Sequence, residues 1–118
     1  MKYLCLAYGA EEDWRALTEA EQDALLAADE VIRERGALMA AVDTDVVTVH
    51  ARDGSAPSAH AGSYTSSRVP LAGFSVIEAA DLQEVIALVA KTPCAQARGA
   101  IEIRSIHTMN DLEWRSRR

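Results

Sequence analysis

Apolar residues are grouped along this chain in short runs, and the runs are separated by longer amphipathic stretches. Two of the longer stretches carry apolar residues at helical spacing and predict amphipathic helices, at 18–35 and from 81 to about 92. Four short runs have the length and composition of strands, at 2–8, 38–42, 71–78 and 100–104. The order of these elements is strand, helix and strand, repeated once.

The ends of the first helix have clear sequence signals. Thr18 and Glu21 form a capping box, and Gly36 supplies a left-handed stop. Asp81 caps the second helix in the same way, and Pro93 is expected to end it. The apolar residues that should form the buried stripe of the first helix are at positions 24, 25, 28, 31 and 32. Asp29 and Glu30 are therefore expected on a charged face in solvent.

The middle of the chain predicts a hairpin. Residues 46–52 alternate, with Val47 and Val49 on one face, and Asp53-Gly54 is a strong turn dipeptide. Pro57 limits the returning strand, 55–60, to a sheet edge. Residues 61–70 are rich in Gly, Ser and Thr and are expected to form a loop.

Together these elements predict an α+β fold: a ferredoxin-like split βαβ antiparallel sheet with both helices on one face. We expect one domain over residues 1–106 and a C-terminal tail over 107–118. The other face of the sheet would then expose a large apolar patch. Pairing with a second copy would bury it, so the sequence predicts a homodimer that forms a dimeric α/β barrel.

Composition and charge narrow the possible functions. The 118 residues are 49% hydrophobic and 25% charged, as in a globular domain. No apolar run reaches the about 18 residues of a membrane span, and no signal peptide is expected. The net charge is −6, and residues 1–60 hold 12 acidic against 5 basic residues. Such a surface disfavours nucleic-acid binding, and the three arginines of 114–118 suggest a solvated terminus rather than a binding patch.

Neither the two cysteines nor the common catalytic motifs indicate a particular chemistry. Cys5 and Cys94 have no nearby Cys partner, so neither a zinc nor a redox motif is indicated, and a reducing cytoplasm is expected. GxGxxG, Walker A and GxSxG patterns are absent from the sequence. We therefore expect no cofactor and no metal.

Histidine is the remaining candidate for acid–base chemistry, because its ordinary pKa lies near neutrality. His60 and Tyr64 together could give a base and a hydrogen-bond donor at the mouth of a cleft, although an exposed loop histidine is the simpler interpretation. Arg68 or Arg104 could clamp an anionic group. Arg104 and Glu102 share one strand face and could equally form an ordinary ion pair.

Several segments together resemble the YCII-related proteins in their DGPF-type branch. They are Met1–Gly9, Arg35-Gly36-Ala37-Leu38, 49–54, 71–82 and Glu102-Ile103-Arg104, so the resemblance covers about residues 1–106 in order. It implies a ferredoxin-like dimeric α/β barrel and an accessory role beside transcriptional regulators. The family's Asp-Gly-Pro-Phe signature falls on Ala61-Gly62-Ser63-Tyr64, where only the glycine is kept. Residues 18–36 also lack the helix histidine of some relatives, so no acid–base pair can be transferred.

Two functions from different classes remain open from the sequence, beside a third and simpler option, a degenerate paralogue that only completes a heteromeric partner. The first is a small-molecule-binding or accessory module, and it is the one we favour because it tolerates loss of the signature carboxylate. The alternative is an enzyme that acts on a small substrate, such as an aromatic compound, by proton transfer. The candidate catalytic residues are His60 and Tyr64, and the candidate ligand-binding residues are Ser63, Arg68 and Arg104.

Overall fold

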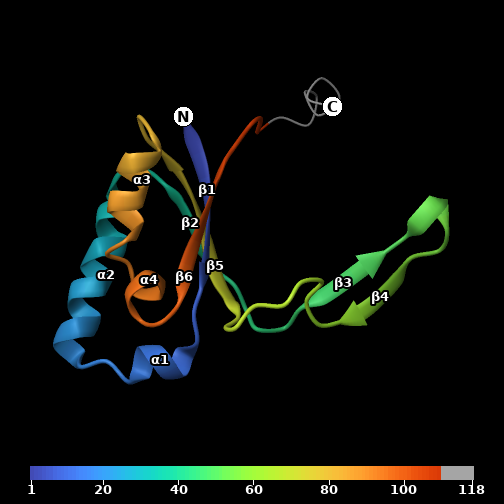
Figure 1. The fold of residues 1–118 in the computed structure, drawn as a ribbon, viewed down its shortest axis with the longest axis horizontal. Coiled ribbons are helices and arrows are strands. Elements are labelled where there is room, and N and C mark those ends of the chain that lie inside the picture. The colour runs from blue at the N-terminus through green and yellow to red at the C-terminus, as the bar shows by residue number, and fades with distance from the viewer. Residues whose placement is uncertain (110–118) are drawn as a thin grey trace.

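The computed structural model describes residues 1–109, so residues 110–118 of the predicted tail, with their three arginines, lie outside the described part. The elements follow the predicted order, with two short helices in addition (Figure 1). They are β1 (Lys2–Tyr8), α1 (Glu11–Arg15), α2 (Glu19–Glu34), β2 (Leu38–Ala41), β3 (Val47–His50), a 3₁₀ turn (Arg52–Gly54), β4 (Ser58–Ala61), β5 (Leu71–Glu78), α3 (Leu82–Val89), α4 (Pro93–Gln96) and β6 (Ala100–Ser105).

Four strands form the main sheet in the order β2-β5-β1-β6, and every neighbouring pair is antiparallel. Two β-α-β units interlock in this order, which is the split βαβ arrangement. In the part of the chain that the structure describes, the four α-helices lie on one side of the sheet and none of them covers the other side (Figure 1). The predicted ferredoxin-like α+β fold is confirmed.

The helix ends obey the local rules that the sequence suggested. Thr18 Oγ1 accepts from the Glu21 backbone N–H at 3.1 Å, and the Glu21 carboxylate accepts from the Thr18 backbone N–H at 2.9 Å. That hydrogen bond from the Thr18 backbone lowers the pKa of Glu21. Gly36 has a φ of +84°, as a left-handed stop requires. The capping box and the helix stop are therefore confirmed.

Two details of the helices differ from the prediction. In α2 only Ile32 is fully buried, while Ala24 and Val31 are exposed, so the predicted stripe was too wide. Leu25 and Ala28 are partly buried on the same side as Ile32, whereas Ala24 and Val31 lie at the margins of this side. After α3, Pro93 begins α4 instead of ending the helical region, because a first-turn position needs no backbone N–H donor.

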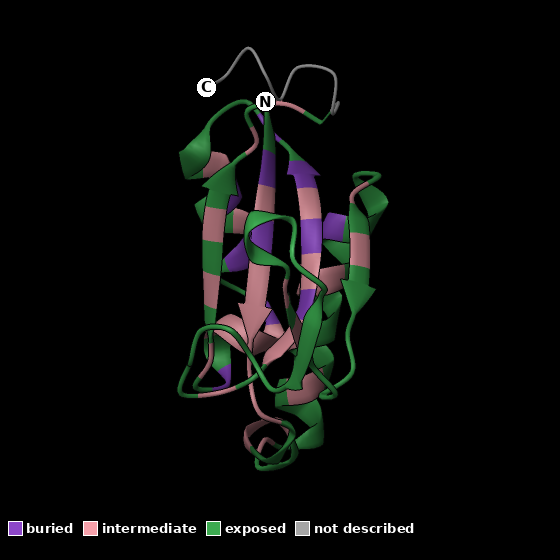
Figure 2. Ribbon diagram, turned by 90° about the vertical axis from the view of Figure 1, so that its right-hand side faces the viewer, coloured by how far each residue is buried: buried purple, intermediate pink, exposed green. Residues whose placement is uncertain are grey.

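The core lies between the helices and one face of the sheet. Seven buried residues form it: Tyr3, Cys5, Ile32, Ile77, Ala79, Val85 and Val89. Figure 2 shows the buried positions as separate bands along the strands, as expected when alternate residues face opposite sides. Within residues 1–109, no helix is long and apolar enough to cross a membrane.

The opposite sheet face, which we call the open face, carries the alternate residues. Leu4 and Leu6 of β1 pair across the strands with Val76 and Phe74 of β5, and all four are partly exposed. Leu38 lies beside Val76 on the edge strand β2 and is 59% exposed. The middle of the open face is therefore apolar over its three contiguous strands β2, β5 and β1, while the charged Lys2 and Glu78 lie opposite each other at one end.

The predicted hairpin forms a separate two-stranded sheet, β3–β4. Together with its flanking segments it makes up residues 42–70, which we call the arm. Asp53 and Gly54 at its tip have positive φ angles of 54° and 72°, as the turn dipeptide predicted. The arm extends away from the body on the side of the open face (Figure 1).

Candidate functional site

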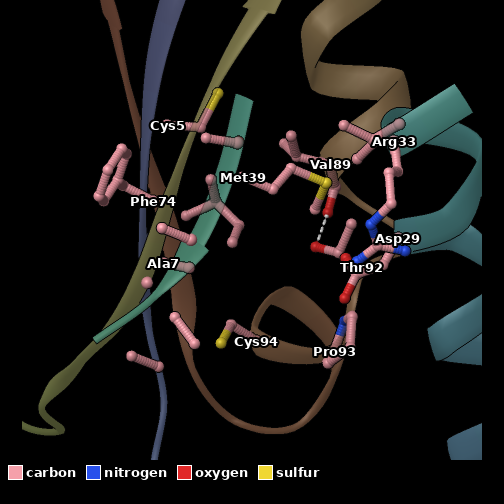
Figure 3. A pocket seen from close by; sticks show the side chains of 17 residues that line it. Cys5, Ala7, Asp29, Arg33, Met39, Phe74, Val89, Thr92, Pro93 and Cys94 are labelled. Carbon is pink, nitrogen blue, oxygen red and sulfur yellow. Dashed lines mark hydrogen bonds between the residues drawn. The ribbon is translucent and has the colours of Figure 1, made fainter. Parts of the chain in front are cut away.

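A cleft lies between the helix layer and the sheet, with a volume of about 260 Å³. Figure 3 shows Cys5, Ala7 and Met39 on its sheet side, and Asp29, Arg33 and Thr92 on its helical side. The remaining lining residues are almost all apolar, and the Phe74 ring lies on the far side of the strands. An apolar cleft with a few converging polar groups is the usual form of a small-molecule site.

The cleft exists because the residues of the sheet become smaller toward one end. On the helix side, β1 presents Tyr3, then Cys5, then Ala7. Their partners on β5 are Ile77, Ser75 and Gly73 in the same order. The large pair fills the core, whereas Ala7 opposite Gly73 leaves space. This decrease in size at alternate positions is visible in the sequence and is a signal from which the cleft could have been predicted.

Asp29 supplies the cleft's carboxylate. It lies on α2, half-buried, one turn before Ile32. Burial raises the pKa of the Asp29 carboxyl, and the nearby Arg33 guanidinium offsets this only in part. The expectation that Asp29 lies on a solvent face was wrong, because Asp29 is three residues before the buried Ile32 and so lies on the same side of α2. Arg33 is itself exposed and pairs with Glu30.

Segment 92–96 closes the cleft beside Asp29. The Thr92 hydroxyl is buried and donates to the Val89 carbonyl at 2.6 Å, which leaves its oxygen able to accept from a ligand. The Cys94 thiol is half-buried, and both burial and the negative charge of Asp29 raise its pKa. Cys94 is therefore a neutral thiol at physiological pH, and a carboxylate acts on it electrostatically.

Two glycines allow segment 92–96 to lie so close to the sheet. A Cβ at Gly99 would be 1.9 Å from the Tyr8 carbonyl oxygen and 2.6 Å from that of Cys94. A Cβ at Gly9 would be 3.0 Å from the Cys94 sulfur. Only a residue without a side chain fits at Gly99, and this close approach holds Cys94 in the wall of the cleft.

A second, wider hollow of about 650 Å³ adjoins the cleft. The two share part of their lining: Ala41, Ala72, Pro93 and Cys94. Trp14 of α1 and the first residues of the arm are among the other residues that line the hollow. Cys94 thus lies where the narrow cleft meets the wider hollow.

The structure places the candidate residues from the sequence outside this cleft. His60 lies on β4 and Tyr64 just beyond it, and both are exposed on the arm together with Ser63. The His50 ring brings the two together, with ring centroids 6.2 Å from His60 and 5.7 Å from Tyr64. The Ser58 hydroxyl also lies 3.0 Å from His60 Nε2. A catalytic role for His60 and Tyr64 stays a prediction, and neither residue lines the cleft.

The two arginines are held by other protein groups. Arg68 Nη2 donates to the Arg98 carbonyl oxygen at 2.6 Å and so ties the base of the arm to the α4–β6 turn. Arg104 forms an ion pair with Glu102 at 3.1 Å on the open face. Their predicted ligand-binding role is not tested by these contacts. Over residues 1–109, no group of three or more His, Cys, Asp or Glu side chains could hold a metal ion.

The fold and the cleft define an α+β protein with a ligand-sized site between its sheet and its helices. The YCII-related domain model matches residues 1–110, so the chain belongs to the YCII-related family. A solved structure similar to this chain is 5-chloro-2-hydroxyhydroquinone dehydrochlorinase (TftG) from Burkholderia phenoliruptrix AC1100, in complex with 2,5-dihydroxybenzoquinone. It shares 18% identity, with 90% of this chain and 93% of that chain covered and a TM-score of 0.46. No curated protein matches the sequence.

Proposed function

We propose that this chain binds a small, mainly apolar molecule that carries one hydrogen-bond donor, and that it acts as a binding or accessory module. The observation that supports this most directly is the apolar cleft with Asp29 half-buried in its wall. An apolar ligand would displace water from the Ala7 and Met39 side. Its donor would meet the Asp29 carboxylate or the Thr92 oxygen, and a carboxylate on the ligand would be repelled by Asp29.

Three single-ring probes test this selectivity: phenol, toluene and benzoate. In NMR titrations we expect phenol to bind most tightly, toluene more weakly and benzoate weakest, with shifts centred on Ala7 and Cys94. Ala7→Leu should abolish these shifts by filling the cleft, whereas Ala24→Leu, exposed on α2, should not. Asp29→Asn should narrow the preference for phenol over benzoate. Shifts that survive Ala7→Leu would contradict the proposal.

A second candidate function, proton-transfer catalysis, has one specific observation in its favour. A carboxyl group with a raised pKa in a cleft is a candidate general acid or base. In this alternative Asp29 would move the proton from inside the cleft, and His60 with Tyr64 would be the competing pair on the arm. Turnover lost in Asp29→Asn but kept in His60→Ala would assign the reaction to the cleft. The reverse result would assign it to the arm.

We further propose that the protein is a homodimer paired through the open face, and that it works in the cytoplasm. The partly exposed Leu4, Phe74 and Val76 support the dimer, because a contiguous apolar face is stabilised when a second copy covers it. The free thiols Cys5 and Cys94 support a reducing location.

A further inference from the structure

Among residues 1–109, no other segment supports the arm along its strands. β3 and β4 pair with each other and with no strand of the main sheet. A two-stranded hairpin that stands alone is marginally stable in water. Every residue of β4 is exposed, and Val47 and Val49 of β3 are 65% and 60% exposed. The arm therefore gains little stability from this one chain.

The arm is nevertheless built with two different faces. The register places Val47 opposite Ala61 and Val49 opposite Ala59, so these four side chains form one apolar face without charges. The other face is polar and consists of Thr48, His50, Ser58 and His60. Thr48 Oγ1 donates to the Gly62 carbonyl oxygen at 2.7 Å, and the Gly62 N–H donates to the Val46 carbonyl oxygen at 2.8 Å. These bonds fix the base of the hairpin, so its apolar face is presented in a defined orientation.

The direction of the arm indicates what covers it. It rises from one end of the open face and extends away from the helices, so that the arm and the open face enclose an angle (Figures 1 and 2). A molecule seated on the open face would therefore lie beside the arm. Within the arm, β3 covers residues 47–50 and is about 10 Å long at about 3.3 Å per residue, and the segment 42–46 that carries it is not a strand. Two stacked sheets are about 10 Å apart, so β3 is long enough to lie along the edge of a sheet that pairs with the open face.

We propose that the apolar face of the arm, Val47, Val49, Ala59 and Ala61, packs against a second copy of this chain, so that two copies clasp each other with exchanged arms. This inference rests on the dimer proposed above. Two-fold pairing places both arms equivalently, and each one extends along the flank of the other copy. The second copy supplies to each hairpin the apolar cover that the described residues of its own chain do not give, and the arm contact continues the contact of the open face.

Sedimentation velocity across a concentration series tests the clasp with the double variant V47T/V49T. Threonine keeps the strand propensity and the approximate shape of valine but replaces one methyl group with a hydroxyl group. We expect the dimer dissociation constant to rise at least tenfold, while the dimer still forms at high concentration. The control His50→Gln, on the polar face, should leave the constant within twofold.

Filtered NOE spectra of a mixed labelled and unlabelled sample locate the contact directly. The clasp predicts intermolecular NOEs from the Val47 and Val49 methyl groups. If NOEs cross between chains from Leu4 or Phe74 but not from the arm, the clasp is refuted and the dimer stands. If the wild-type chain is monomeric at all concentrations, both proposals fail.

Discussion

The proposed dimer, paired through the open face, can be tested by a single substitution at Leu38. This residue lies on the edge strand β2 beside Val76, and 59% of it is exposed. Full burial of a leucine side chain is worth about 1.5–3 kcal/mol, so covering the exposed fraction contributes about 0.9–1.8 kcal/mol per chain. A symmetric dimer buries two such side chains, about 1.8–3.5 kcal/mol in total. Since about 1.4 kcal/mol corresponds to a tenfold change, Leu38→Asn should weaken the dimer by roughly 20- to 300-fold.

Sedimentation velocity from submicromolar to hundreds of micromolar concentrations measures this change. The matched control is Val31→Asn on α2, which removes an apolar side chain of similar exposure, 52%, on the helical side of the molecule. The control should keep the wild-type dissociation constant. The reasoning is refuted if Leu38→Asn leaves the constant within twofold, or if Val31→Asn weakens the dimer equally. Circular dichroism should show both variants folded, because exposed substitutions change stability little.

Three further predictions concern the cleft. Burial raises the pKa of Asp29, so from about pH 4 up to the raised pKa the folded chain binds more protons than the unfolded chain. The free energy of unfolding therefore falls as pH rises through this window. Urea titrations should show Asp29→Asn gaining stability over the wild type across the same window, and a difference that does not change with pH would count against burial of the carboxylate. Asp29→Asn should also accelerate alkylation of Cys94 at mildly alkaline pH, because the Asp29 charge helps to raise the pKa of that thiol; an unchanged rate, measured by mass spectrometry, would show that the two groups do not interact. Gly99→Ala should destabilise the fold by about 3 kcal/mol or more, since its Cβ would lie 1.9 Å from the Tyr8 carbonyl oxygen. Gly36→Ala, with a φ of +84° and open space around it, should cost only about 1 kcal/mol, and equal losses of melting temperature would contradict the steric argument.

The sequence predicts the backbone of this protein well because the signals are local. The capping box at Thr18, the stop at Gly36 and the turn at Asp53-Gly54 each depend on residues a few positions apart. The order of strands and helices then leaves few possible topologies. These features needed no knowledge of how distant segments pack.

The cleft was harder to predict because it depends on segments far apart in the sequence. In the sequence, Asp29 cannot be told from the other carboxylates of the helix. Only the folded structure shows that α4 places Cys94 near it. The α4 turn itself is short, and Pro93 is compatible with either an end or a beginning of a helix. The sequence made His60 a candidate because the ordinary pKa of histidine lies near neutrality. The structure places His60 on the arm, and it does not line the cleft.

The same two strands serve both proposed roles of this molecule, because alternate residues face opposite sides. On β1, Leu4 faces the open side and Cys5 faces the cleft, and on β5 Phe74 and Gly73 are divided in the same way. Ligand binding and pairing of two copies are therefore set by adjacent residues in sequence. A one-residue shift of either strand would exchange the two faces and destroy both properties together. Substitutions at single positions, in contrast, can separate them, so the cleft and the dimer can be tested independently in one folded chain.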